Sequence, residues 1–485
     1  MSPVCLWNDE LVNSFYRFIF ADKASRAPYL YGLELPDPFL YDVRGPLFST
    51  VNDRLAAILR EAVHLEYLCF PSSVEVDPVL TSAANATTLR ELHVAFVSHM
   101  EPSWKLLSSF QSPLLSLYVE EDDGAYDQCF ASVLTNDLAN FAPTLEILDL
   151  YKLVLDMSPD SVTTQFAAVR TLKIRTISDF DGLGLLLRLF PNLDNTLTLS
   201  EVMNTTDRSH STLRERSKEA QRTHSWPRLD RVVCDAQSAF LLAVQCPIRR
   251  MDITVPRFHG KRYLASTLRD NYPRFLYIRI SFNDSLADLD DLFPCTEGAE
   301  TLTHLVMVAD FEIRYMQKGK KGKKGKRQTV SWKQFRDKLV DSMKHLHLTH
   351  LRLVLYYTVI KPTQDSVAKR DSVNTAGDAD LYPVALRFSD AMPSLQYIFV
   401  TTCGHMHDIL PGNPQQASPP RTLLNKWHTS KAWRAVREPL PEDRQNGSNA
   451  DSTSRAPCME LSWVAAERVI AQEELELSPN EEKLD

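Results

Sequence analysis

The chain has 485 residues, of which 44% are hydrophobic and 24% are charged, and its formal net charge is −8. These fractions are typical of a folded protein, and the acidic balance disfavours general nucleic-acid binding. No run of about 18 consecutive apolar residues is present, so the sequence predicts no membrane-spanning helix.

The start of the chain and the cysteines indicate a reducing compartment. Residues 1–10 contain neither a basic stretch nor an apolar stretch, so we expect no signal peptide. The eight cysteines are scattered and none forms a Cys-x-x-Cys pair, which favours free thiols over a disulfide framework. We therefore expect the protein in the cytoplasm, with the nucleus as the alternative.

In chain order, one short pattern recurs between residues 30 and 400. It is an apolar residue followed by apolar residues three and five positions later, and its best copy is Leu145, Leu148 and Leu150. Several neighbouring copies lie about 24 to 27 residues apart, within the range of leucine-rich repeats. The copies begin at Leu30, Leu65, Leu89, Leu114, Leu145, Val169, Leu193, Leu229, Ile248, Phe275, Leu302, Leu348 and Leu395.

Each copy predicts a short strand, because alternating leucines point to one face of a strand. The gaps at 54–63, 183–190 and 332–343 carry apolar residues at helical spacing. Strands alternating with helices predict an α/β fold: an irregular leucine-rich-repeat solenoid, or horseshoe, with parallel strands on the concave face and helices on the convex face. A non-repetitive α/β fold is the alternative.

We expect two parts, a solenoid over residues 1–410 and a C-terminal capping segment with a flexible tail over residues 411–485. Polar stretches predict inserted loops near 201–226, 316–329 and 361–383, and for the first of them a partly helical section around residues 213–220 is the alternative.

The capping segment contains two apolar stretches. Residues 422–433 are expected to pack against the end of the solenoid, and residues 462–475 predict a final helix.

The sharpest chemical feature is the basic run 318–327, in which lysines alternate with glycines. It fits a nuclear-import signal or a phosphate-binding loop, but a solvated insertion between a helix and a strand is the preferred interpretation. The glycines make a flexible tether, which favours the insertion.

Two histidine-rich stretches contain residue types that can bind a metal ion. Cys403, His405 and His407 have no second Cys/His pair at a zinc-finger spacing, so we expect no metal site there. The other stretch, which we expect to be a helix end with surface histidines, contains His345, His347 and His350.

Motifs of catalysis are absent from the sequence. It contains neither a Gly-rich phosphate loop nor a Gly-x-Ser-x-Gly elbow. The acidic run 120–123 follows a predicted strand and is expected to turn in solvent. We assign no catalytic residue, no metal ligand and no cofactor, and expect a protein that is not an enzyme.

A family resemblance adds to this interpretation. Residues 15–22, then 28–35, then irregular Pro-x-Leu-x-x-Leu-x-Leu repeats resemble the leucine-rich part of fungal F-box-like proteins. Such proteins are similar to substrate receptors of SCF-type ubiquitin ligases, in which the F-box holds the adaptor subunit and the repeats hold the target. The Leu-Pro-x-Glu-like start of an F-box is not visible here, so we expect the F-box to be absent or encoded upstream of Met1.

The resemblance implies a non-enzymatic substrate receptor that binds a protein target through its repeat surface. Its partners would be that target and, if an F-box lies upstream, the SCF adaptor subunit, with neither a membrane nor nucleic acid involved. A structural or scaffolding leucine-rich-repeat protein without a ubiquitin link is the alternative. The candidate binding residues, which alternate with the core leucines, are Glu91, His93, Tyr118, Asp149, Tyr151, Lys173, Arg175, Asp252, Arg279 and Arg352.

Overall fold

The structure of the protein is a computed structural model. It describes residues 2–24, 26–35, 47–70, 76–96, 104–121, 129–203, 207–255, 260–282, 289, 292–314, 332–362, 380–409, 421–436 and 458–477. The chain forms two compact units. The N-terminal unit consists of Met1–Cys234 with Leu241–Pro247, and the C-terminal unit consists of Asp235–Phe240 with Ile248–Asp485.

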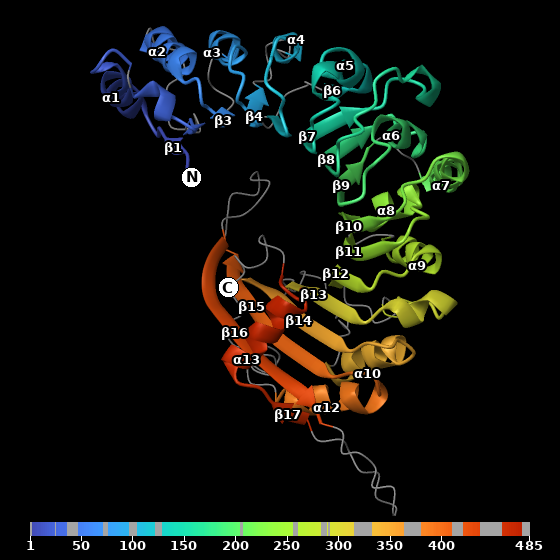
Figure 1. The fold of residues 1–485 in the computed structure, drawn as a ribbon. Coiled ribbons are helices and arrows are strands. Elements are labelled where there is room, and N and C mark those ends of the chain that lie inside the picture. Colours follow the sequence, from blue (N-terminus) through green and yellow to red (C-terminus); the bar gives the residue numbers. More distant parts are fainter. Residues whose placement is uncertain are drawn as a thin grey trace, which may run out of the picture. The chain divides into compact units, whose positions relative to one another are not determined.

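The N-terminal unit is a sheet of short parallel strands, with its helices on one side of the strands (Figure 1). The strands are β1 (Val4–Cys5), β2 (Gly32–Glu34), β3 (Tyr67–Phe70), β4 (Glu91–Phe96), β5 (Ser116–Glu121), β6 (Cys129–Phe130), β7 (Ile147–Val154), β8 (Thr171–Ser178), β9 (Thr196–Val202) and β10 (Leu229–Asp235). The helices are α1 (Asp9–Phe20), α2 (Leu47–Glu61), α3 (Val76–Ala83), α4 (Trp104–Leu107), α5 (Ala131–Asn136), α6 (Gly184–Leu189) and α7 (Asp207–Thr223). A further helix, α8 (Ala236–Leu242), contains residues of both units.

Aligned leucines form the core of this unit. The first leucine of each strand lies beside its counterpart in the next strand, as Leu117 does beside Leu148 and Leu148 beside Leu172. All three are fully buried. Since each strand pairs with its neighbour in parallel, the recurring apolar pattern becomes one continuous buried row, as the spacing of the repeats predicted.

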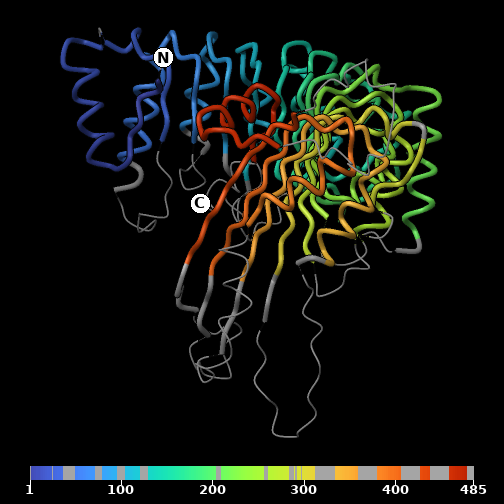
Figure 2. The backbone as a smooth tube through the Cα atoms, turned by 90° about the horizontal axis from the view of Figure 1, so that it is seen from below, coloured from blue at the N-terminus to red at the C-terminus, as the bar shows by residue number. Residues whose placement is uncertain are grey.

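The C-terminal unit has a longer-stranded sheet that ends in two antiparallel strands. Figure 2 follows its strands side by side. They are β11 (Ile248–Val255), β12 (Phe275–Phe282), β13 (His304–Arg314), β14 (His350–Pro362), β15 (Tyr397–Ile409), β16 (Arg421–Ala435) and β17 (Cys458–Glu460). The helices are α9 (Gly260–Asp270), α10 (Trp332–Met343), α12 (Tyr382–Ala391) and α13 (Trp463–Gln472).

Both faces of this second sheet are covered. On the face of the core leucines, Phe335 of α10 packs edge-on against Phe282 and Phe311. On the opposite face, Ala466 and Ile470 of α13 belong to one buried cluster with strand residues. That cluster includes Tyr277, Val306, Val308, Val354, Tyr356, Phe399, Cys403 and Ala432. Figure 1 shows α13 and α10 on opposite sides of these strands.

The C-terminal cap agrees in part with expectation. Strand β16 pairs antiparallel with β15, so residues 422–433 do extend the end of the sheet. Helix α13 is the predicted final helix and is capped by the Ser462 hydroxyl, which accepts from the Ala465 amide. It lies against a sheet face, however, where a solenoid was expected to expose its strands.

Two predictions about local structure need correction. In the stretch 201–226, where helix was expected only around residues 213–220, helix α7 extends over residues 207–223, and its His210, Arg214 and Ser217 are buried. Most of its inward face is polar, so it shows little of the apolar periodicity that marks a helix. In β12 the predicted copy of the pattern is two residues out of register. It would place Ile278 beside Leu305, whereas Leu276 occupies that position.

Several other predictions lie largely or wholly outside the described residues. These are the basic run 318–327, the loops near 316–329 and 361–383 apart from their ends, and residues 122–123 of the acidic run. The predicted boundary between residues 410 and 411 also falls there and stays a prediction. Among the described residues, no helix combines the length and the apolar character needed to cross a membrane.

Candidate protein-interaction face

The side chains that alternate with the core leucines of β3, β4, β5, β7 and β8 form what we call the N-terminal strand face. The strand register makes His93, Tyr118, Asp149 and Lys173 direct neighbours along this face. Seven of the ten candidate binding residues therefore come together as predicted from the alternation. They are Glu91, His93, Tyr118, Asp149, Tyr151, Lys173 and Arg175.

Stacked rings occupy one part of the N-terminal strand face. The His93 and Tyr118 rings stack with their centroids 3.9 Å apart, and Tyr67 lies on the other side of His93 at 5.4 Å. His93 Nε2 lies 2.8 Å from Glu91 Oε1, so the carboxylate fixes the imidazole ring. Burial raises the pKa of Tyr118, with Glu91 and Asp149 adding to the effect, which keeps its phenol neutral. The result is a preorganised aromatic surface.

Charges of both signs lie beside these rings. Lys173 Nζ is 3.5 Å from Asp149 Oδ2, and the side chains are 40% and 34% exposed. The same ammonium group lies 5.7 Å from the Tyr118 ring, and the Arg175 guanidinium lies 4.9 Å from the Tyr151 ring. Burial raises the pKa of Asp149, and Lys173 opposes that shift. The face is thus polar, aromatic and partly exposed, with both cations lying over tyrosines.

The remaining three candidates lie in the C-terminal unit, where the corresponding face is covered. Asp252 was expected to be exposed but is buried, and its Oδ1 accepts a 2.8 Å hydrogen bond from Arg250 Nε. Arg352 Nη1 donates to the Leu475 carbonyl oxygen at 2.7 Å. Arg279 lies 3.5 Å from Asp310. These side chains serve contacts within the unit, and a role in partner binding stays a prediction for them.

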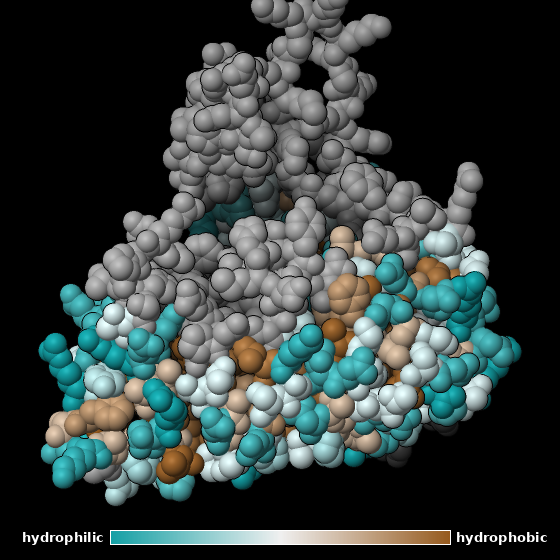
Figure 3. Space-filling view, turned by 90° about the horizontal axis from the view of Figure 1, so that it is seen from above, coloured by the Kyte–Doolittle hydropathy of each residue, from teal (hydrophilic) through white to brown (hydrophobic). Residues whose placement is uncertain are grey.

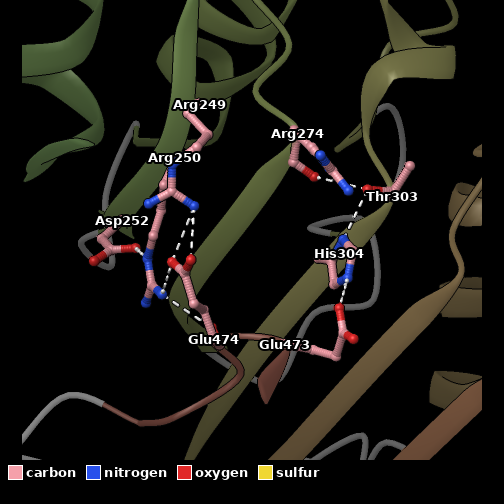
Figure 4. A network of polar contacts seen from close by, with 8 residues as sticks. All are labelled: Arg249, Arg250, Asp252, Arg274, Thr303, His304, Glu473 and Glu474. Carbon is pink, nitrogen blue, oxygen red and sulfur yellow. Dashed lines mark hydrogen bonds and ion pairs between the residues drawn. The ribbon is translucent and has the colours of Figure 1, made fainter. Parts of the chain in front are cut away.

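The C-terminal segment, residues 461–477, is held on this face by a polar network (Figure 4). Arg249 Nη1 lies 2.9 Å from Glu474 Oε1, and Arg250 Nη1 donates to the Glu474 carbonyl oxygen at 2.9 Å. Glu474 has a positive φ of 52°, a conformation that costs energy in a residue other than glycine. The two arginines therefore hold the chain in a turn directly after α13.

A ladder of rings crosses the same sheet. Phe275, His304, His350 and Tyr397 are paired in register on β12 to β15. Their centroids are separated by 4.2, 4.4 and 5.0 Å, and each pair is stacked. The expectation that His350 is a surface histidine is wrong, because it is 7% exposed. Among the described residues, a metal ion could be held by the group of His304, His350 and Glu473.

Burial governs the protonation of this histidine pair. It is the main cause that lowers the pKa of His350 to about 4, and the neighbouring His304 acts in the same direction. It also lowers the pKa of His304, although the Glu473 carboxylate, 3.1 Å from Nε2, acts in the opposite direction. Both imidazoles are neutral at pH 7 as a result.

The Cys403–His407 stretch lies in β15. Cys403 is buried, and His405 Nδ1 is 2.5 Å from the Tyr356 hydroxyl. The side chain of His407 lies outside the described residues.

Sequence reasoning missed the arginines, histidines and glutamates that hold the C-terminal segment. A signal was present, because residues 304–309 and 351–356 are nearly continuous apolar runs rather than alternating ones. Such runs are typical of parallel strands buried on both faces. The apolar Val306, Val308 and Val354 stand where the N-terminal unit has polar residues, so they predict a covered face.

In comparisons with known proteins, no family model matches the chain, and no curated protein matches it.

Proposed function

We propose that the chain is a non-enzymatic protein-interaction module that binds a protein target through the N-terminal strand face. The carrying observation is that this face gathers Tyr67, Tyr118, Tyr151, Arg175 and Lys173 on neighbouring strands while its side chains stay partly exposed. Tyrosine and arginine are enriched among the residues that dominate protein–protein binding energy.

The distribution of apolar residues supports this choice of surface. In the view of Figure 3, hydrophobic residues of the described surface are scattered among hydrophilic ones. Exposed large side chains such as Trp7, Phe18 and Tyr29 occur, but single exposed hydrophobic residues are normal on protein surfaces. An ordered aromatic and charged face is the stronger candidate for a specific partner.

We further propose that the repeats are of the leucine-rich type and that the protein acts as an F-box-like substrate receptor of an SCF-type ubiquitin ligase. The parallel strands, the buried leucine row and the helices on one side support the repeat type. The ubiquitin link rests on the sequence resemblance alone. A scaffolding repeat protein without that link is the second candidate.

Charge reversal tests the binding face. The variant Lys173→Glu/Arg175→Glu removes both cations from their tyrosines. A matched control, Arg222→Glu/Lys344→Glu, makes the same charge change at side chains that are 75% and 60% exposed and lie elsewhere. Tagged full-length protein of each kind is used for quantitative affinity capture. The face variant is expected to lose its specific partners by about tenfold or more while the control retains them. Equal capture by both variants rules out this face.

Co-purification with the ligase adaptor separates the two candidate roles. The transcript is first extended upstream of Met1, and the longer product is compared with the present chain. If the longer product forms a complex with the adaptor, the result supports the role of substrate receptor. If the extended transcript encodes no F-box and no adaptor co-purifies, the scaffold is favoured.

A further inference from the structure

Two buried histidines and one glutamate meet where the C-terminal segment crosses the sheet. His304 and His350 are the first residues of β13 and β14 and are partners in the strand register. Their rings lie 4.4 Å apart and are nearly parallel, at 8°. Parallel strands thus point both imidazoles in one direction, toward the turn that follows α13.

Each imidazole is oriented by the threonine that precedes it. Thr303 Oγ1 lies 2.7 Å from His304 Nδ1, and Thr349 Oγ1 lies 2.9 Å from His350 Nδ1. Thr349 Oγ1 also donates to the Thr303 carbonyl oxygen at 3.1 Å, so it accepts its second hydrogen bond from Nδ1–H of His350. This leaves the Nε2 lone pair of His350 available. A hydrogen bond donated by Nδ1–H, which leaves Nε2 as the ligand atom, is the usual support of a metal-binding histidine.

The Glu473 carboxylate completes the group. Its Oε2 lies 3.1 Å from His304 Nε2, and one ligand atom from each of the three residues lies within 4.8 Å of the other two. Ligands around tetrahedral zinc, with bonds of about 2.0–2.1 Å, lie roughly 3.3 Å apart. The ligand atoms must therefore move closer together to bind an ion, and Glu473, whose side chain is 39% exposed, is the least confined of the three.

The charges around the group leave room for a cation. Arg249 and Arg250 face the turn but are bound by Glu474 and Asp252. Arg274 lies over the Phe275 ring at 5.4 Å and disfavours a cation, whereas Glu473 favours one. Two imidazoles and a carboxylate match the preferences of zinc, and the fourth position is left to water.

We propose that His304, His350 and Glu473 bind one zinc ion, which fixes the C-terminal segment to the strands of the C-terminal unit. The ion joins two neighbouring strands to a segment more than one hundred residues later in the chain. Its role is structural, and it does not depend on the partner-binding function proposed above.

Metal titration of the full-length protein tests this site. The protein is stripped with a chelator, and zinc binding is followed by calorimetry and by metal content after dialysis. We expect one ion per chain, bound at about 1 µM or tighter. Cobalt, added in place of zinc, should give the visible absorption bands of a low-coordinate site. Absence of stoichiometric binding overturns the proposal.

Conservative variants locate the ion. Glu473→Gln keeps the size of the side chain and removes its charge, and His350→Gln keeps a polar side chain of similar volume without the imidazole; each should weaken zinc binding by ~100-fold. The matched control is His347→Ala, an exposed histidine in the same stretch, which should bind zinc as the wild type does. Circular dichroism establishes that each variant folds, and Glu473 is the safer position because it is partly exposed. Unchanged affinity in Glu473→Gln places any bound ion elsewhere and overturns the site.

Hydrogen exchange tests the structural role. Zinc should slow amide exchange over residues 461–477 by at least about tenfold in the wild type but leave it unchanged in Glu473→Gln. Zinc that binds without slowing exchange in that segment overturns the fixing role.

Discussion

His350 links the packing of the C-terminal unit to pH. Its buried ring stacks between His304 and Tyr397, and burial lowers its pKa from 6.5 to about 4. Below pH 6.5 the unfolded chain binds a proton at this side chain that the folded chain does not. Stability must therefore fall as pH falls from about 6.5 to about 4.

We expect the free energy of unfolding of the metal-free wild type to decrease more steeply over that pH window than that of His350→Gln. Urea denaturation at pH 7.5, 6, 5 and 4.5 gives both curves. The comparison removes the contribution of ionisable groups that both proteins share. Parallel curves would mean that His350 is protonated as easily in the folded protein as in the unfolded one.

Gly404 is required by the close packing of β14, β15 and β16. A Cβ built at this position would meet the Tyr357 carbonyl oxygen directly and Trp427 Cζ2 at 2.7 Å. Because the carbonyl belongs to the backbone of a paired strand, it cannot move aside cheaply. Gly404→Ala should therefore destabilise the protein by about 2 kcal/mol or more.

The control is Gly298→Ala, where the nearest atoms, of Tyr272, would lie at ordinary contact distances beginning at 3.5 Å. Thermal unfolding of both variants decides the matter. Similar midpoints for the two proteins would contradict the close approach at Gly404.

At the scale of elements, α13 stabilises the fold through the side chains on its buried side rather than those on its exposed side. Ile470 is 8% exposed and belongs to the apolar cluster with Val354 and Phe399, whereas Val464 on the same helix is 68% exposed. Ile470→Ala should lower the free energy of unfolding by about 2 kcal/mol, and Val464→Ala by less than about 0.5 kcal/mol. Urea denaturation measures both, and equal effects would show that α13 does not pack on the strands in solution.

The elements also show what a sequence can predict. Strands β3, β4, β5, β7 and β8 followed from the recurring apolar pattern, because each of these copies contributes to one buried row. Helix α7 followed only in part, around residues 213–220, since its buried face carries His210, Arg214 and Gln221 and is satisfied by hydrogen bonds such as that from Gln221 Nε2 to the Ala243 carbonyl oxygen. Apolar periodicity in a sequence predicts helices whose buried face is apolar and misses helices whose buried face is polar.

The candidate site could likewise be predicted from the sequence only in part. Neighbouring strands bring Tyr118, Asp149 and Lys173 together, so alternation and repeat spacing were sufficient to predict them. The contacts of Arg250 with Glu474 and of His304 with Glu473 join positions far apart in the chain. No local pattern encodes such pairings, although the continuous apolar runs of β13 and β14 do indicate that something covers them.

At the scale of the whole molecule, the chain forms two compact units, and within each unit most strands pair with their neighbours in sequence. In such chains stability is carried mainly by contacts between adjacent repeats. A destabilising substitution in the core at one strand should therefore lower the local stability of the neighbouring strands most.

Hydrogen exchange of two core variants tests this. Leu148 and Leu353 are both buried, one in each unit, and Leu→Ala at such sites typically costs about 3–5 kcal/mol. Leu148→Ala should accelerate exchange in β5, β7 and β8 and leave β14 and β15 close to the wild type, and Leu353→Ala should do the reverse. A similar acceleration across both units in either variant would mean that the chain opens as one cooperative structure, in which case the local pairing of repeats does not set its stability.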